Sequence, residues 1–355
     1  MREVNSGYLY SMLVRKKGIS PLQGQLELTY RCELNCVHCY CKGSEDKERE
    51  LETSQWKDIL DIIKDEGCMY IVFTGGNPFI RDDFLDIFLY AKKKGFIITI
   101  FTNGYNLTDK VLRYFSKYPP HCIEITLNGI TQGTYETITR KEGSFKKVIT
   151  NIQEIKKINI PLILKANCLK QNKDELVKIK IFADEFLGKR NGKYHFRYDP
   201  MIYPRLNGNK IPCDYRLSFE ELLELRKQDE DIWSEYKKSL ESDLPDFKRD
   251  RIYLYRCNAW MNQFFINPYG KLKFCVFSDK FSIDLKDTSF REGFYKVFPQ
   301  LLEEKFKTDS KCIDCRLRSI CYHCPARAYL ETGDEEAPVS YYCELAEKTA
   351  KLMGK

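Results

Sequence analysis

Three cysteines follow the first strand-like segment of this chain at a spacing of C-x3-C-x2-C. Cys32, Cys36 and Cys39 come directly after the alternating segment Gln25–Tyr30. Three thiolates can hold three irons of a [4Fe–4S] cluster and leave the fourth iron open to another ligand. An open iron is a site for chemistry, whereas a fully ligated cluster mainly stores electrons. The motif therefore predicts a reactive iron–sulfur site right after a strand.

The composition is that of a globular protein rich in metal ligands. The chain has 355 residues, enough for two domains, and it is 43% hydrophobic and 31% charged. No apolar run is long enough to span a membrane, and Met1–Tyr10 lacks the features of a secretion signal, so we expect a cytoplasmic protein.

Fifteen cysteines are many for such a protein. Disulfide frameworks belong to small secreted chains, so metal ligation is the better interpretation. Five scattered cysteines are predicted to be small buried hydrophobes: Cys41, Cys68, Cys122, Cys168 and Cys213. The formal charge of +7 does not indicate nucleic-acid binding, because the basic residues are spread along solvated helix faces and iron–sulfur clusters would cancel much of the excess.

Strand and helix patterns alternate from Gln23 to about Pro200. The expected strands are Gln25–Tyr30, Met69–Phe73, Ile97–Phe101, Ile123–Leu127, Leu162–Asn167 and Tyr194–Tyr198. The expected helices are Ser54–Glu66, Asp83–Lys94, Asp109–Ser116, Phe145–Lys157 and Lys173–Leu187, with Asn172 and Glu175 as a start signal of the last. Six such units predict an α/β fold, a partial (β/α)6 TIM-like barrel whose site lies at the C-terminal strand ends.

The pattern changes after Pro200. Ser218–Ser239 is predicted to be a linking helix opened by a Ser-x-x-Glu box. Gln263–Ile266 and Lys271–Cys275 flank Asn267-Pro268-Tyr269-Gly270, which is typical of a β-hairpin. We therefore expect an N-terminal segment (1–21), a barrel (22–215), a helical linker (216–256) and a small cysteine-rich domain (257–355) in which metal replaces a core.

The surroundings of the cysteine triplet carry a family resemblance. Arg31, Leu34-Asn35 and Tyr40 flank the cysteines, and the segment resembles the cluster loop of the radical S-adenosylmethionine (SAM) enzymes. The resemblance implies that the open iron binds SAM and that the cluster reductively cleaves it to a 5′-deoxyadenosyl radical. From the residues alone, a zinc site or a buried cysteine cluster is the alternative.

Loops after later strands extend this resemblance. Gly75-Gly76-Asn77-Pro78 is similar to the family's Gly-Gly-Glu-Pro loop, although Asn77 lacks the charge of the usual glutamate. Arg140 resembles an arginine that reaches the SAM carboxylate; the alternative is an arginine in solvent. The resemblance implies SAM contacts by Tyr40, Gly75, Gly76, Asn77, Asn103, Thr126, Asn128, Arg140 and Asn167. Arg197 and Asp199 either face the cavity or pair with neighbours.

Seven further cysteines lie in the last hundred residues: Cys257, Cys275, Cys312, Cys315, Cys321, Cys324 and Cys343. Their arrangement resembles the SPASM domain, the auxiliary-cluster extension of peptide-modifying radical SAM enzymes. The resemblance implies an outer [4Fe–4S] cluster on Cys312, Cys315, Cys321 and Cys343, and an inner one on Cys257, Cys275 and Cys324. The C-x2-C spacing of Cys321 and Cys324 departs from the usual C-x3-C, so another partition stays open, as do two zinc ions. With three cysteine ligands, the fourth iron of the inner cluster is either open or bound by a water, by Cys213 or by a carboxylate.

Together these features predict a radical SAM enzyme that abstracts a hydrogen from a ribosomally synthesised peptide, leading to a crosslink, epimerisation or cleavage, with auxiliary clusters aiding the oxidation. A sulfatase-maturing (formylglycine-generating) enzyme is an alternative, although Val276 stands where that group typically has Asp. A small-molecule radical SAM oxidase and a non-catalytic electron carrier are two more. The expected partners are a peptide or protein substrate, a separate leader-binding protein and an external flavodoxin or ferredoxin, with no nucleic acid and no membrane.

Overall fold

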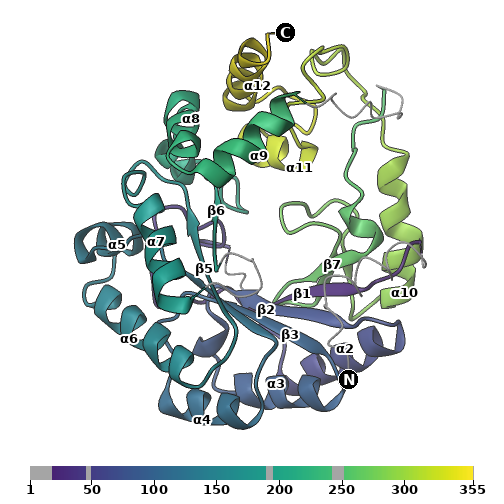
Figure 1. Cartoon of the computed structure of the whole chain (residues 1–355). Helices are drawn as coiled ribbons and strands as arrows, with labels where there is room; N and C mark the ends of the chain where they lie inside the picture. The colour runs from purple at the N-terminus through teal and green to yellow at the C-terminus, as the bar shows by residue number, and fades with distance from the viewer. Residues whose placement is uncertain (1–17, 45–48, 189–194, 242–251, 355) are drawn as a thin grey trace.

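The computed structural model describes residues 18–44, 49–188, 195–241 and 252–354. Six parallel strands form a partial barrel in the order β6-β5-β4-β3-β2-β1, inside an arc of helices (Figure 1). The strands are β1 (Gln23–Thr29), β2 (Tyr70–Gly75), β3 (Ile97–Thr102), β4 (Cys122–Thr126), β5 (Leu162–Asn167) and β6 (Phe196–Asp199). The helices are α2 (Thr53–Asp65), α3 (Phe84–Lys93), α4 (Asp109–Lys117), α5 (Gln132–Thr139), α6 (Ser144–Lys157) and α7 (Leu176–Leu187). The predicted partial barrel is therefore confirmed, although Tyr194 of the sixth predicted strand lies outside the described residues.

The helices pack on the barrel through one apolar face each. In α2, the buried side chains are Trp56, Ile59, Leu60 and Ile63, a spacing of three and four residues. In β3, buried and partly buried residues alternate, as expected for a strand with two different faces.

The C-terminal region continues the barrel sheet. Strand β7 (Gln263–Ile266) pairs in parallel with β1, and β8 (Lys271–Lys273) and β9 (Ile283–Asp284) follow in antiparallel order. The predicted hairpin turn is confirmed, because Asn267 donates its amide to the Lys271 carbonyl and Gly270 adopts a φ of +91°. The pairing of β7 with β1 was not predicted from the sequence. It extends the sheet to nine strands.

The helices that follow β6 are α8 (Phe219–Lys227), α9 (Glu230–Glu241), the short α10 (Phe290–Glu292), α11 (Pro325–Thr332) and α12 (Ser340–Leu352). Of these, α8, α9, α11 and α12 lie together at the top of Figure 1. A short π-helix spans Gly293–Val297, and 3-10 turns occur at Pro78–Ile80 in the barrel and at Ile211–Tyr215, Ala259–Met261 and Phe298–Leu302 after it. Side chains from the barrel and from the C-terminal region, such as Leu26 and Phe264, belong to one hydrophobic core. No helix in the described part of the chain is long and apolar enough to cross a membrane.

Three local predictions were wrong. The linker forms two helices instead of one, because the Asp229 carboxylate caps a second start by accepting from the Asp231 and Ile232 amides. Helix α5 was not predicted. Asn172 and Glu175 do not form a capping box; the Glu175 carboxylate instead binds the Ile130 and Thr131 amides at the start of α5. The Ser218–Glu221 box at the start of α8 is confirmed.

Candidate active site

A cavity of about 540 Å³ lies at the C-terminal ends of the barrel strands. It is lined by all three cysteines of the triplet, Cys32, Cys36 and Cys39. Seven of the nine residues predicted to contact SAM also line it: Tyr40, Gly75, Gly76, Asn103, Thr126, Asn128 and Asn167. The structure thus brings together side chains from the loops after β1, β2, β3, β4 and β5.

The loop that carries the cysteines is held by the end of α5. The amides of Asn35 and Val37 donate to the carbonyls of Thr139 (2.9 Å) and Ile138 (3.0 Å). These carbonyls belong to the last turn of the helix, where they have no partner within the helix itself. The unpredicted helix therefore fixes the middle of the cysteine loop.

Positions 75 and 76 have no room for a side chain, because the start of the cysteine loop lies directly against their backbone. A Cβ on Gly75 would lie 2.1 Å from the Thr29 carbonyl oxygen, and one on Gly76 would lie 2.3 Å from the Arg31 carbonyl oxygen. Gly75 also has a φ of +129°. The two glycines thus let the backbone of β2 approach the cysteine loop, in addition to lining the cavity.

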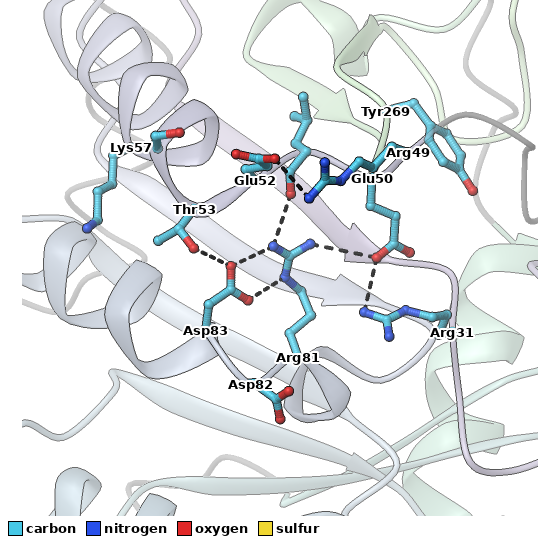
Figure 2. A pocket seen from close by; sticks show the side chains of 12 residues that line it. Arg31, Arg49, Glu50, Glu52, Thr53, Lys57, Arg81, Asp82, Asp83 and Tyr269 are labelled. Carbon is cyan, nitrogen blue, oxygen red and sulfur yellow. Dashed lines mark hydrogen bonds and ion pairs between the residues drawn. The ribbon is translucent and has the colours of Figure 1, made fainter.

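The buried side chain of Arg81 holds the end of β1, just before the cysteine loop, in place (Figure 2). The Arg81 guanidinium donates to the carbonyls of Leu28 and Leu51, both at 3.0 Å, and forms a two-pronged ion pair with Asp83. Arg81 Nη1 also lies 3.7 Å from Oε2 of Glu50. The other carboxylate oxygen of Glu50 accepts a hydrogen bond from the Thr29 hydroxyl at 2.6 Å. Together, Arg81 and Glu50 connect the end of β1 to the segment before α2.

The donor set around the triplet fits an iron–sulfur cluster. Asn103 Nδ2 donates to Cys32 Sγ at 3.3 Å. A hydrogen bond from the Cys41 thiol, followed by the amides of Cys41 and Lys42, lowers the pKa of Cys39 to about 7. The Arg205 Nε is buried, has no hydrogen-bond partner among the described residues and lies near enough to Cys39 to lower its pKa further. Donors of this kind stabilise cluster sulfurs and thiolates.

The described residues contain no group of three His, Cys, Asp or Glu side chains placed to hold a single metal ion. A cubane cluster needs a wider arrangement than a single ion, because each thiolate binds a different iron. In the described chain all fifteen cysteines are free thiols, and four of the five scattered ones are buried, whereas Cys213 is partly exposed.

The buried Asn128 and the half-buried His38 form a pair on the wall of the cavity. Asn128 Oδ1 accepts from the Asn167 amide at 2.8 Å, so its Nδ2 donates to His38 Nε2 at 3.3 Å. Burial lowers the pKa of His38 to about 4, which keeps the ring neutral. His38 Nδ1 then carries the proton and is buried without a partner in the described chain. His38 was missed at the sequence level, although its place between Cys36 and Cys39 was a signal.

Two residues predicted to contact SAM lie away from the cavity lining. Asn77 is fully buried, and its amide is already used: Nδ2 donates to Glu33 at 2.6 Å and Oδ1 accepts from Thr102 at 2.9 Å. Arg140 is exposed at the end of α5 and donates to the Tyr215 hydroxyl at 3.4 Å. Neither residue lines the cavity, and their SAM contacts stay predictions; the bond to Glu33 shows that Asn77 holds the cysteine loop.

Charged side chains that the motifs did not identify line the far wall of the cavity. Lys165 on β5 and Arg197 on β6 both pair with Glu124, the former at 3.8 Å. Burial lowers the pKa of Lys165 to about 8, although Glu124 opposes this effect. Asp199 faces the same space and accepts from the Met201 amide. Of this group, Arg197 and Asp199 were named from the sequence as residues that face the cavity or pair with neighbours. Arg197 does both, whereas Asp199 faces the cavity and its contact is the hydrogen bond from the Met201 amide.

Four C-terminal cysteines surround a second, small cavity. Cys312, Cys315, Cys321 and Cys343 line a space of about 70 Å³ at the start of α12. These are the four cysteines that the resemblance assigns to the outer cluster.

The other three C-terminal cysteines lie near one another. The pKa of Cys275 is raised to about 12, mainly by burial and in smaller part by the neighbouring Cys324 and Cys257. Phe277, two residues after Cys275, lines the main cavity. The three cysteines assigned to the inner cluster therefore lie close enough together to influence one another, and Cys275 lies near the cavity.

Comparison with known proteins agrees with this site. Residues 26–183 match the model of the radical SAM superfamily. The AdoMet-dependent heme synthase of Methanosarcina barkeri is 25% identical over 339 residues, which are 89% of this chain and 95% of that protein. The sporulation killing factor maturation protein SkfB of Bacillus subtilis is 26% identical over 156 residues, 44% of this chain and 38% of that protein.

Solved structures share the fold over nearly the whole chain. Streptococcus suis SuiB bound to its precursor peptide SuiA has a TM-score of 0.68 at 16% identity, covering 94% of this chain and 80% of that one. The anSMEcpe structure with AdoMet and a Cp18Cys peptide also has a TM-score of 0.68 at 16% identity, covering 93% of this chain and 96% of that one.

The fold and the site define the class of protein. The chain contains a radical SAM domain, and it is an enzyme whose cofactors are SAM and a [4Fe–4S] cluster.

Proposed function

We propose that this enzyme uses its radical SAM domain to oxidise a peptide or protein substrate. The observation that carries the proposal is the single cavity of about 540 Å³, which is lined both by Cys32, Cys36 and Cys39 and by Phe277 and Arg327 of the C-terminal region. A substrate in that cavity would contact the cofactor site and the region of the seven later cysteines at once.

The residues of the chain have separate tasks in this proposal. Cys32, Cys36 and Cys39 hold the cluster, and Asn103 stabilises the Cys32 thiolate by donating to it. When bound, the cluster and SAM supply a radical that abstracts a hydrogen atom from the substrate. The neutral His38 and the amide of Asn128 present polar groups to the ligand, and the buried walls exclude water.

The C-terminal region is proposed to be a SPASM-type domain with two auxiliary clusters. Cys312, Cys315, Cys321 and Cys343 would hold the outer one, since they share one small cavity. Cys257, Cys275 and Cys324 would hold the inner one. When bound, an auxiliary cluster would accept the electron that the substrate radical loses on oxidation. The separate electron needed for SAM cleavage would come from an external flavodoxin or ferredoxin.

A peptide substrate is supported by the names of the relatives. SuiB and anSMEcpe share the fold and are seen with a precursor peptide and a Cp18Cys peptide, and SkfB is a maturation protein. A separate leader-binding protein would present the peptide, and crosslinking, epimerisation and cleavage are all compatible with hydrogen abstraction. Formylglycine formation in a sulfatase is a narrower form of the same function.

A second candidate function is that of a small-molecule radical SAM oxidase, acting on a substrate of heme synthesis. It is favoured by one observation, the 25% identity to the AdoMet-dependent heme synthase over 89% of this chain. Both functions use the same cofactor site and differ only in what enters the far part of the cavity.

Anaerobic reconstitution with iron, sulfide, reductant and SAM tests the proposal. The wild type should form 5′-deoxyadenosine and contain about twelve irons per chain, as three [4Fe–4S] clusters require. Cys32→Ala should lose 5′-deoxyadenosine formation and keep about eight irons. A wild type that binds iron but forms no 5′-deoxyadenosine would refute the enzymatic proposal, whereas about four irons would refute the two auxiliary clusters.

A further inference from the structure

The guanidinium of Arg327 lines the main cavity without a carboxylate partner. Its Cζ lies 4.2 Å from the ring centre of Tyr203 and 5.5 Å from that of Phe277. Among the described residues it makes no hydrogen bond and no ion pair, and the thiols of Cys324 and Cys275 lie near it. An arginine that is stacked on two rings and partly buried has a fixed orientation, so its donors are available in one direction.

The other cationic side chains that line the cavity differ from Arg327 because they have an acidic partner. Lys165 and Arg197 share the carboxylate of Glu124, and both lie over the ring of Phe101. Arg216, nearby on the C-terminal side, is bound by Glu331 through two hydrogen bonds of 2.8 and 2.7 Å. Among the described cationic side chains that line the cavity, Arg327 alone has no acidic partner.

The charge of the cavity wall favours an anion. The charged residues that line it are Lys165, Arg197 and Arg327, against the single carboxylate of Asp199. Asp199 forms no ion pair within 4.0 Å in the described chain, and one of its oxygens is occupied by the Met201 amide. Glu124 offsets part of the charge of Lys165 and Arg197, and together with Asp199 this leaves a small positive excess for an incoming anion.

We propose that Arg327 binds a carboxylate of the substrate through its planar fork, with Tyr203 and Phe277 forming the sides of this subsite. The inference rests on the proposed function and narrows its substrate to a molecule that carries a carboxylate. An Arg fork matches a planar carboxylate with two parallel hydrogen bonds, and the aromatic sides reduce competition from water. The source of the carboxylate is either an acidic residue of a peptide or a small carboxylic acid.

Two matched pairs of probes distinguish these sources in equilibrium dialysis against the anaerobically reconstituted enzyme with SAM. The first pair is two peptide pools with amidated C-termini that carry Glu or Gln at the centre and no other acidic residue. The second pair is a porphyrin with carboxylate side chains, as a probe for a small carboxylic acid, and its methyl ester. The wild type should prefer the carboxylate member of one pair about tenfold or more, since a charge-assisted hydrogen bond has this magnitude.

Variants assign this preference to Arg327. Arg327→Gln should reduce it to less than about twofold, and Arg327→Lys should keep a part of it because the charge remains without the fork. Arg291→Gln removes an exposed arginine that pairs with Glu66 far from the cavity lining, and it should leave the preference unchanged. Iron content and circular dichroism establish that each variant is folded.

Three outcomes overturn the inference. They are a wild type without preference in either pair, an Arg327→Gln variant that keeps the preference, and a variant in which only the midpoint potential of an auxiliary cluster shifts. The last would assign Arg327 to the nearby thiolates of Cys275 and Cys324. A wild type that binds the carboxylate probe but forms no 5′-deoxyadenosine would refute the proposed function and leave the carboxylate subsite standing.

Discussion

Replacing Arg81 by methionine should destabilise the fold strongly and loosen the cysteine loop. The side chain of Arg81 is 6% exposed. Its loss would remove the donors to the Leu28 and Leu51 carbonyls and leave the carboxylates of Asp83 and Glu50 without their buried cation (Figure 2). Removing one partner of a buried ion pair costs about 3–5 kcal/mol. The two carbonyls belong to the same network, so their cost does not simply add.

Arg49→Met is the matched control, because Arg49 lines the same hollow and also pairs with a glutamate (Figure 2). Arg49 is 85% exposed and Glu52 is 54% exposed, so this pair should contribute about 0–1 kcal/mol. Anaerobic urea unfolding followed by circular dichroism gives the free energy of unfolding of each variant. Iron bound by the triplet should also fall in Arg81→Met, because Glu50 would no longer be held against the Thr29 hydroxyl.

Equal unfolding free energies for Arg81→Met and Arg49→Met would refute this reasoning. The two substitutions remove the same charge and differ mainly in burial and in the number of hydrogen bonds. A small effect at both positions would mean that water reaches Asp83 and Glu50 readily, and that the network does not hold the end of β1.

Further substitutions test other contacts. Gly75→Ala should lower the free energy of unfolding by at least about 1–3 kcal/mol in urea titrations, because its φ of +129° is strained for alanine and a Cβ would lie 2.1 Å from the Thr29 oxygen. Burial raises the pKa of Glu175, but its hydrogen bonds lower it below 4.5 overall. Its stabilisation is therefore complete above that pH and is lost as the pH falls through the folded-state pKa. The stability difference between wild type and Glu175→Gln should stay constant in unfolding curves from pH 6 to about pH 5 and shrink as the pH falls below about 4. Asn77→Glu would place a second carboxylate against Glu33 and should lower the free energy of unfolding by about 3–5 kcal/mol in the same assay. Adding Glu33→Gln to that variant should recover a large part of this loss. No recovery would refute the contact between the two side chains.

The barrel could be predicted because each strand and helix has a local pattern. The strand Leu162–Asn167 was placed correctly to the residue, since its apolar residues are bounded by Pro161 and the polar end of the strand. Helix α5 was missed because its eight residues, Gln132–Thr139, include three threonines and a glycine, which have low helix propensity. It forms because Glu175, distant in the sequence, binds its first amides.

The cysteines that would hold the cofactor could be predicted from the sequence, whereas the arginine proposed to bind the substrate could not. Cys32, Cys36 and Cys39 have a fixed spacing because one short loop holds them all. Arg327 has no such signal, since it reaches the cavity only through the packing of Tyr203 and Phe277 against it. The role of Asn77 could not be predicted for the same reason. Its amide donates to Glu33, 44 residues earlier in the chain, and this contact explains why an amide fits here better than the usual glutamate.

Strand β1 connects these two ends of the site. One edge of β1 pairs with β2, whose loop supports the cysteine triplet through Gly75, and its other edge pairs with β7 in register from Gln23↔Gln263 to Leu26↔Ile266. The chain then turns at Asn267 and returns through β8 to Cys275 and Phe277. Gly24 is part of this pairing, because a Cβ there would lie 2.5 Å from the Phe264 ring, so only a glycine lets that ring pack against the strand. Since backbone pairing across one strand positions both the triplet and Cys275, the sheet fixes the separation between the triplet and Cys275. A substrate held between them would therefore meet both sites in one constant geometry.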